Sequence, residues 1–250
     1  QYDGPGICLS LRGVPTDLIG TVGHPVLVLR REQVHCRFKY NRLGSSEHVK
    51  HCKECQCPIG EPQWLPLSEV VIGDYLLTPI PQIGSEGVAP EFAEAVGWVA
   101  SEGYLPGGGR GIQFTFSSKN EVDILSVELC LGEFGIRVKV YPRRDGLTSL
   151  DGRGDLADAL EQFVIGVKAE KHILGKVLSW NAEALLHLLG AYLDGDGHIC
   201  SEGRNGGQLR IRSSSSQMLY ILADIIRGLR VDCTINWDTH LHYMHPPTNK

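Results

Sequence analysis

Apolar and polar residues alternate differently along the two parts of this chain. Before residue 35, two short apolar runs, Ile7 to Leu11 and Pro25 to Leu29, are separated by glycine and proline, which is typical of short strands and turns. Residues 64–81 alternate apolar and polar positions around Gly73-Asp74, so they predict a strand, a turn and a second strand. Residues 35–60 show neither the apolar period of a helix nor that of a strand. We therefore expect an all-β region that is interrupted by an irregular insert.

After residue 90 the apolar spacing lengthens and indicates helices that alternate with short strands. The predicted helices cover 91–102, 120–134, 155–164, 170–179, 182–195 and 215–229. The predicted strands lie near 112–117, 136–143, 208–213, 231–236 and 240–244. The fold class is therefore α+β, with residues 1–80 and 91–250 as separate domains and the Gly-, Pro- and Ser-containing residues 81–90 as a linker.

The helical part contains an internal repeat, EFAEAVGWVASEGYL and ALLHLLGAYLDGDGHI. Each copy places small residues in an apolar helix, ends on an acid and follows the acid with glycine. The small residues are Gly97, Ser101 and Gly103 in the first copy and Ala191, Gly195 and Gly197 in the second. This spacing predicts two helices that pack closely and in parallel, so that Glu102 and Asp196 emerge together at one end. Either copy alone would be only a buried helix with a glycine after its end.

An acid at a helix C-terminus is unfavourable by about 0.3 to 1 kcal/mol, because the macrodipole is negative there. Two such acids, Glu102 and Asp196, call for a positive partner. Mg²⁺ binds one or two carboxylates and leaves its other positions to water and phosphate oxygens. The pair therefore predicts a magnesium site suited to phosphodiester hydrolysis.

Composition and charge place the chain among globular proteins. Its 250 residues are 42% hydrophobic and 21% charged, enough for one large domain or two smaller ones. No apolar run could cross a bilayer and no signal segment opens the chain, so we expect a cytoplasmic protein. The net charge of -5 does not indicate a nucleic-acid binder, so any DNA-binding charge has to be local.

The repeated segments LLGAYLDGDGHI and VGWVASEGYL resemble the LAGLIDADG homing endonucleases, in the dodecapeptide (DOD-type) form carried by inteins. The resemblance covers about residues 88–245, and its two motifs are those of a single-chain enzyme. It implies a pseudo-two-fold saddle of two αββαββα-type halves, each with a four-stranded antiparallel sheet over double-stranded DNA. It also implies that Glu102 and Asp196 bind the catalytic Mg²⁺ ions.

A family block of the form Lys-x-Ile-Pro is similar to Lys171-His172-Ile173-Leu174, with leucine in place of proline. The resemblance implies that Lys171 assists catalysis, by stabilising transition-state charge or by helping the attacking water. The alternative is a solvated lysine at a helix start.

Basic and amide side chains that share a strand face are the candidate DNA contacts, because side chains alternate with period 2. They are Gln113, the group Arg137, Lys139, Tyr141 and Arg143, and the group Gln208, Arg210 and Arg212. Arginine and glutamine suit guanine and adenine edges in the major groove, and arginine and lysine also contact phosphates. The alternative is a solvated sheet face.

The first eighty residues resemble part of the Hint domain of inteins. Thr21 and His24 match a Thr-x-x-His block that activates the first splice junction, and Gly73-Asp74 matches a second block. The resemblance implies a nucleophile at the start and a His-Asn pair at the end, and neither is present. We therefore expect a partial Hint region that does not splice as written.

Four of the eight cysteines lie between residues 36 and 57. Cys52-x-x-Cys55 is a zinc knuckle, which Cys36 and one of Cys57, His48 or His51 would complete. The site residues we assign to zinc are Cys36, Cys52, Cys55 and Cys57; reduced, unliganded thiols are the alternative. The histidines at 240, 242 and 245 are predicted to be ordinary surface or DNA-facing residues.

The sequence thus predicts a monomeric, site-specific, Mg²⁺-dependent endonuclease that binds a long double-stranded DNA target. One alternative is a catalytically inactive DNA-binding protein or RNA-splicing maturase of the same fold. Another is a Hint autoprocessing protein. Retention of both acids favours the nuclease, since binding alone does not need them.

Overall fold

The computed structural model describes residues 5–11, 18–34, 60–108, 111–200, 208–231 and 233–235. The chain forms two compact units, Gln1–Pro79 with Thr234–Lys250, and Ile80–Cys233. Within the described ranges, every helix is too short or too polar to cross a membrane. The fold is of the mixed α+β type, with small antiparallel sheets in both units.

The first unit is built from short antiparallel strands. β1 (Gly6–Leu9) pairs with β2 (Leu18–Thr21), and a three-stranded sheet has the order β4-β3-β5. Its strands are β3 (Pro25–Leu29), β4 (Gln63–Pro66) and β5 (Tyr75–Leu76), accompanied by the helix α1 (Arg31–Val34) and the 3₁₀ turn η1 (Leu67–Glu69). The buried side chains of Val26, Val28 and Leu67 form its core. The strand predicted from residue 64 is shorter than expected because the chain turns at Leu67.

Gly73 and Asp74 have separate structural roles in this unit. The side chain of Asp74 is 1% exposed and pairs with Arg30, with 2.7 Å between Arg30 Nη1 and Asp74 Oδ2. The amide of Val71 also donates to Asp74 Oδ2, at 3.1 Å. Burial alone would raise the pKa of Asp74, but these hydrogen bonds and the Arg30 charge hold it below its ordinary value. Gly73 provides the turn, at a φ of 102° that favours glycine.

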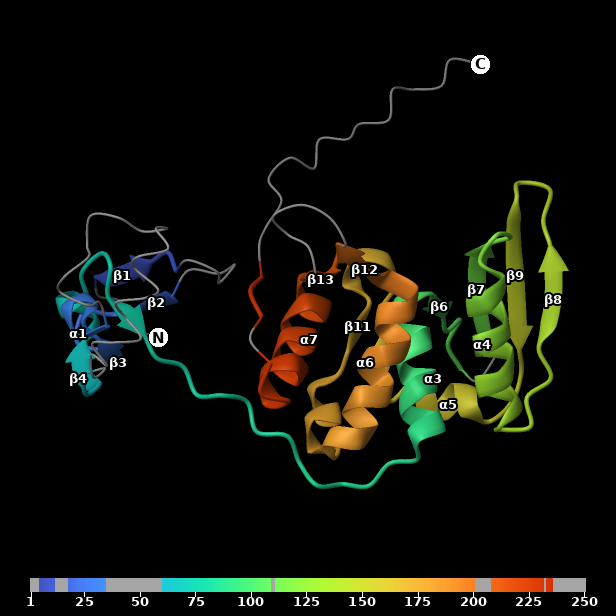
Figure 1. Ribbon diagram of the computed structural model, residues 1–250, viewed down its shortest axis with the longest axis horizontal. Helices are drawn as coiled ribbons and strands as arrows, with labels where there is room; N and C mark the ends of the chain where they lie inside the picture. Colours follow the sequence, from blue (N-terminus) through green and yellow to red (C-terminus); the bar gives the residue numbers. More distant parts are fainter. Residues whose placement is uncertain are drawn as a thin grey trace, which may run out of the picture. The chain divides into compact units, whose positions relative to one another are not determined.

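The second unit alternates helices and strands (Figure 1). Its helices are α3 (Pro90–Ser101), α4 (Glu121–Gly132), α5 (Leu156–Leu160), α6 (Ala182–Asp196) and α7 (Ser216–Gly228), with 3₁₀ turns η2 (Lys168–Glu170) and η3 (Gly175–Ser179). Its strands are β6 (Gly103–Tyr104), β7 (Ile112–Ser117), β8 (Lys139–Pro142), β9 (Leu147–Gly152), β10 (Val164–Ile165), β11 (His172–Ile173), β12 (Gly197–Cys200) and β13 (Gln208–Ile211). The first repeat carries a four-stranded antiparallel sheet of order β6-β7-β9-β8. In the described part of the second repeat, β12 pairs with β13.

Helices α3 and α6 lie side by side at the centre of this unit (Figure 1). A Cβ placed on Gly97 would collide with the carbonyl of Leu188 and lie 2.8 Å from the Cβ of Ala191. A Cβ on Gly195 would lie 2.8 Å from the Cβ of Ser101. Each contact joins equivalent positions of the two repeats, as a parallel pair related by a pseudo-two-fold axis requires. The predicted close packing of the two helices is confirmed.

Gly103 and Gly197 were expected to allow close packing between the helices, but they have a different structural role. Each would clash with its own helix, Gly103 with Val99 and Gly197 with Leu193. They let the chain leave each helix directly into β6 and β12.

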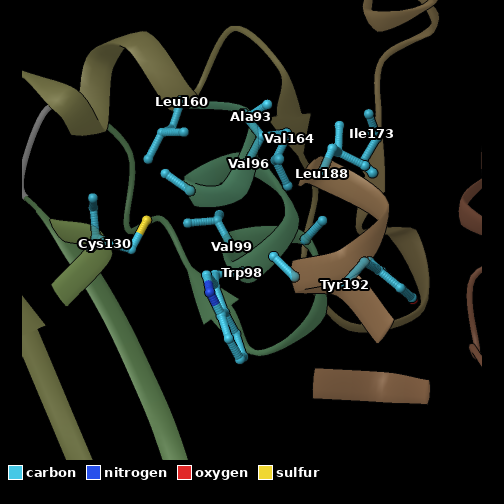
Figure 2. Packing of buried hydrophobic residues seen from close by; sticks show 14 of the residues in the cluster. Ala93, Val96, Trp98, Val99, Cys130, Leu160, Val164, Ile173, Leu188 and Tyr192 are labelled. Atoms are coloured by element: carbon cyan, nitrogen blue, oxygen red, sulfur yellow. The ribbon is translucent and has the colours of Figure 1, made fainter. Parts of the chain in front are cut away.

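The core of this unit surrounds α3 (Figure 2). Eight of the twelve residues of α3 are buried, and Trp98 packs edge to face against Phe116, with 6.3 Å between ring centroids. Residues 81–90 also pack onto this unit. The amide of Gly84 donates to Leu178 O at 2.6 Å, and a Cβ on Gly228 would collide with Ile83.

The sequence missed β9 and placed one helix wrongly. β9 occupies the centre of the four-stranded sheet, next to both β7 and β8. The helix predicted over 170–179 is wrong, because β11 and the turn η3 occupy that segment. The strand predicted over 231–236 is also wrong at residues 231 and 233–235, which are irregular; the one over 240–244 lies outside the described residues.

Candidate active site

Glu102 and Asp196 meet at the ends of the two central helices. Asp196 is the last residue of α6, and Glu102 caps α3 directly after Ser101. A Cβ on Gly195 would lie 3.1 Å from Cγ of Glu102, so no side chain separates the end of α6 from this carboxylate. Helix geometry and the 94-residue repeat thus place the two acids together.

Both carboxylates are half-buried and both are harder to ionise than usual. Burial raises the pKa of Glu102 to about 7, and the neighbouring charge of Asp196 adds to this effect. Burial likewise raises the pKa of Asp196, while the Lys171 ammonium and the Tyr192 hydroxyl act in the opposite direction. Two acids beside one lysine leave an excess of negative charge, which a divalent cation would neutralise.

Lys171 reaches this site from the end of the loop that joins the antiparallel strands β10 and β11. This loop requires glycine at Gly166, which has a φ of 78° and no room for a Cβ beside the carbonyl of Glu170. Ile173, 1% exposed, anchors β11 in the core. Burial lowers the pKa of Lys171, whereas the charges of Asp196 and Glu102 raise it.

The ammonium of Lys171 donates to main-chain carbonyls on both sides of Glu102. The distances from Nζ are 2.7 Å to Ser101 O, 3.1 Å to Gly103 O and 3.3 Å to Val99 O. Helix α3 has no basic residue in its own last turn. Lys171 therefore supplies positive charge to this helix end from a distant segment.

Tyr192 is a site residue that the sequence reasoning missed. It lies one turn before Asp196 on α6 and is 1% exposed. Its hydroxyl donates to the Asp196 carboxylate and accepts from the Ser213 hydroxyl. Burial, and then the Asp196 charge, raise its pKa. The spacing of four residues before the acid was the available signal, because such residues share a helix face.

A pocket of about 590 Å³ opens beside Asp196. Lys168, Lys171 and Arg212 bring positive charge to its wall, and Tyr104, Tyr192 and Met218 provide apolar surface. The three cations come from the β10–β11 hairpin and from the segment after β13. A polyanion such as a phosphodiester backbone suits this combination of charges beside a carboxylate.

The donor set fits a hydrated hard cation. Among the described residues, no three His, Cys, Asp or Glu side chains gather as a complete ligand cage. Two carboxylates alone leave most positions of an octahedral ion to water and substrate oxygens, as Mg²⁺ sites commonly do. The cysteines proposed for zinc, Cys36, Cys52, Cys55 and Cys57, lie outside the described residues.

The four-stranded sheet brings several predicted DNA contacts onto one exposed face. Gln113 of β7 lies opposite Asp151 of β9, which lies opposite Lys139 of β8. Tyr141 lies in the next row, opposite Ser149. Directly paired residues share a face, so amide, carboxylate, ammonium and phenol groups are presented together.

The remaining predicted DNA contacts occupy other positions. Arg137 is exposed just before β8, and Arg143 follows β8 in an exposed ion pair with Asp145 at 2.8 Å. Gln208 and Arg210 lie on β13, where Arg210 Nη2 donates to Gln208 Oε1 at 3.3 Å. Arg212 lies beyond that strand and lines the pocket.

Thr21 and His24 lie together in the first unit. Thr21 ends β2, and the amide of His24 donates to Thr21 O at 3.0 Å across the turn into β3. His24 is exposed. The turn brings the two residues close, and their part in splicing stays a prediction.

The exposed sheet face contains residues that the sequence reasoning did not assign. Thr115 pairs with Ser149, and Asp151 lies between Gln113 and Lys139. The missed signal was the Asp145-Gly146 pair, a strong hairpin marker. Gly146 adopts a φ of 79° there, as a short loop between β8 and β9 requires.

Comparison with known proteins gives distant relatives. No family model matches the chain. Iron-sulfur cluster assembly SufBD family proteins of Mycobacterium bovis and Mycobacterium tuberculosis are 27% identical over 222 residues, which is 84% of this chain. The match covers 25% of each relative, so the chain spans about a quarter of their length.

Solved structures of homing endonucleases are similar to part of this chain. I-DmoI in complex with DNA and Ca has a TM-score of 0.45 and 17% identity, over 63% of this chain and 81% of that one. I-WcaI bound to its DNA recognition sequence has a TM-score of 0.43 and 14% identity, over 62% and 74%. A mesophilic variant of I-DmoI has a TM-score of 0.43 and 16% identity, over 61% and 84%.

Proposed function

We propose that this protein is a site-specific double-strand DNA endonuclease that uses a divalent cation. The observation that carries the proposal is the meeting of Glu102 and Asp196 at the adjacent ends of α3 and α6. Both acids are half-buried, and burial raises the pKa of each, while the charge of Asp196 raises that of Glu102 further, so the pair is unfavourable in the free protein. A bound cation would offset this repulsion, so the arrangement suits catalysis better than stability.

Glu102 and Asp196 would hold the metal, and Mg²⁺ is the proposed ion. When bound, the ion would supply an activated water and neutralise charge on the leaving oxygen of a phosphodiester. The carboxylates would orient the ion at the helix ends, next to the pocket wall to which Tyr104 and Met218 contribute. Arg212 and Lys168 would hold the DNA backbone on either side of the scissile bond.

The exposed sheet face would lie along the DNA groove. Gln113, Lys139 and Tyr141 offer base-edge and phosphate contacts from adjacent strands. Arg137 and Arg143 would add contacts from exposed positions at the two ends of β8, and Gln208 and Arg210 would add contacts from β13 in the separate two-stranded sheet. With a net charge of -5, we expect binding that weakens steeply as salt rises.

An intein origin is the proposed setting for this activity. The residues Thr21, His24 and Gly73-Asp74 support a partial Hint region ahead of the nuclease. The mycobacterial match supports it too, because this chain accounts for only a quarter of proteins named for iron-sulfur cluster assembly. An inserted intein within such a host would give a partial match of this kind.

A cleavage assay on a randomised DNA library with Mg²⁺ tests the proposal, with sequencing of the cut ends. The matched control is the Glu102→Gln, Asp196→Asn double variant, which removes both charges with little change in shape. We expect one long site that is cut only by the parent. Enrichment of a long DNA or RNA sequence in Ca²⁺ without cutting would instead support the inactive binder or maturase.

A further inference from the structure

We propose that Lys171 is a positioning residue, which fixes the main chain on both sides of Glu102 through its contacts with Val99 O, Ser101 O and Gly103 O. The contact itself is independent of the proposed function; its effects on cation binding and on cleavage rest on that function.

Lys171 uses its full hydrogen-bonding capacity on these carbonyls. An ammonium has three N–H donors and no acceptor, and three carbonyl oxygens lie between 2.7 and 3.3 Å from Nζ. A donor aimed at a phosphate or an attacking water would have to give up one of these bonds. The arrangement is that of a helix cap, not of a side chain pointing into open space.

The three carbonyls belong to every second residue along the chain around Glu102. Ser101 and Gly103 flank Glu102 directly, and Val99 belongs to the last turn of α3. Holding the peptide groups before and after Glu102 fixes the direction of its side chain. The rest of this helix end is held locally, since Ser101 Oγ donates to Gly97 O and Trp98 O, both at 3.2 Å.

The hairpin that carries Lys171 is itself anchored in the core. Ile173 is buried, Val164 pairs with Ile173, and the Gly166 turn leaves no room for a side chain. Positioning therefore runs from β11 through the ammonium to the end of α3 and so to the metal-binding carboxylate. Such outer partners of metal ligands commonly affect metal affinity by about 10- to 100-fold.

The direction of the change in metal affinity separates this role from two others. Loss of a positioning residue should weaken cation binding by about 10-fold or more, with cleavage restored at saturating cation. Loss of a merely electrostatic neighbour should tighten cation binding, because a positive charge leaves the two carboxylates. Loss of a direct catalytic group should lower the cleavage rate even at saturating cation.

The experiment combines hydrogen exchange with cation titration for Lys171→Met and Lys171→Arg. In the metal-free protein, Lys171→Met should speed amide exchange at residues 102–104 by about tenfold, and Lys171→Arg should restore much of the protection. Lys168→Met is the matched control, because it removes the same charge from the same pocket without touching these carbonyls. It should leave exchange at 102–104 unchanged.

Unchanged exchange in Lys171→Met, or tighter cation binding, would overturn the proposal. If that variant does not fold, the parent protein gives the answer: a capped ammonium should show a protected Lys171 Nζ signal by NMR, and a rapidly exchanging one would refute the cap. If the parent cuts no DNA, exchange and Mn²⁺ titration still judge the cap, so its failure and that of the proposed nuclease remain distinguishable.

Discussion

The ends of α3 and α6 share a backbone design and differ in what surrounds them. At both ends an acid, the C-cap residue of α3 and the last residue of α6, is followed by a glycine that leads into a strand. At α3, Lys171 binds three carbonyls around Glu102. At α6, no basic side chain within the described ranges donates to the last carbonyls, and Tyr192 contacts Asp196 from within its own helix. Repetition of the fold therefore does not make the two carboxylates equivalent.

This difference has a physical origin in the elements beside each helix. The β10–β11 hairpin lies close to the end of α3 and delivers a lysine, whereas the segment after β13 brings Arg212 and Ser213 to the pocket at Asp196. The seam, which is the close packing of α3 against α6 at Gly97 and Gly195, fixes how near the ends of the two helices come.

The largest effect is expected from the acids themselves. Glu102→Gln and Asp196→Asn should each reduce double-strand cleavage by about 10³-fold, because the transition state loses metal-borne charge stabilisation. Strand-specific end labels should show unequal residual nicking of the two strands, since the two acids have different surroundings. Glu133→Gln, at the exposed end of α4, is the control. Parent-like cutting by either active-site variant would refute its role.

The next largest effect is expected from substitutions that disturb the packing of α3 against α6 at the seam. Gly97→Ala should destabilise the second unit by about 3 kcal/mol, because its Cβ meets the Leu188 carbonyl, which cannot move without shifting α6. Gly195→Ala meets a side chain, Ser101, and should cost less. Gly190→Ala, with nothing within 4 Å, should be neutral or stabilise the helix by up to about 1 kcal/mol.

Denaturant unfolding of the three glycine variants measures this order. Equal losses of unfolding free energy in Gly97→Ala and Gly190→Ala would mean that helix packing at the seam does not limit stability. Cleavage should follow the same order, since a wider seam separates the two acids.

The sequence predicted the seam and the two acids because both depend on short-range patterns. Spacing within a helix fixes which small residues share a face and places the acid at the helix end. Gly97 and Gly195 therefore lie at the helix contact, and Glu102 and Asp196 lie close together, as expected. Period-2 alternation also placed Lys139 and Tyr141 on one face of their strand, although the strand β9 that pairs with it was missed.

The sequence could not give the contacts that cross between distant segments. Nothing local to Lys171 shows that its ammonium reaches carbonyls about 70 residues earlier, and the expected helix over 170–179 would have pointed it elsewhere. Local propensity failed there because tertiary packing of Ile173 decides the conformation. The Asp74 ion pair with Arg30 likewise depends on strands that are far apart in the chain.

Removal of the Glu102 carboxyl should change how the stability of the metal-free protein depends on pH. The folded-state pKa of Glu102 is raised from 4.5 to about 7, so this carboxyl adds stability below pH 4.5 that is lost as pH rises through about 7. Glu102→Gln should therefore stabilise the protein at pH 8 by about 1 kcal/mol, after allowance for solvent screening at a half-buried site.

Thermal unfolding at pH 5 and pH 8 without metal checks this prediction. The gain should be larger at pH 8 than at pH 5, and the exposed control Glu133→Gln should show a smaller dependence. A saturating divalent cation should reverse the sign, because the parent alone would bind it. A gain that is the same at both pH values would mean that ionisation of Glu102 is not the cause.

The smallest effect tests the end of α6. Tyr192→Phe removes a hydroxyl that donates to Asp196 and should cost about 1 kcal/mol of stability. Tyr220→Phe is the matched control, because the Tyr220 hydroxyl is buried without a hydrogen-bond partner in the described structure, and its removal should be neutral or stabilising. The Tyr192 change should weaken cation binding less than Lys171→Met does, because one hydrogen bond orients Asp196 whereas three fix the chain around Glu102. Equal losses of cation affinity in the two variants would mean that the two helix ends are held equally well, and the asymmetry between them would then lie in charge alone.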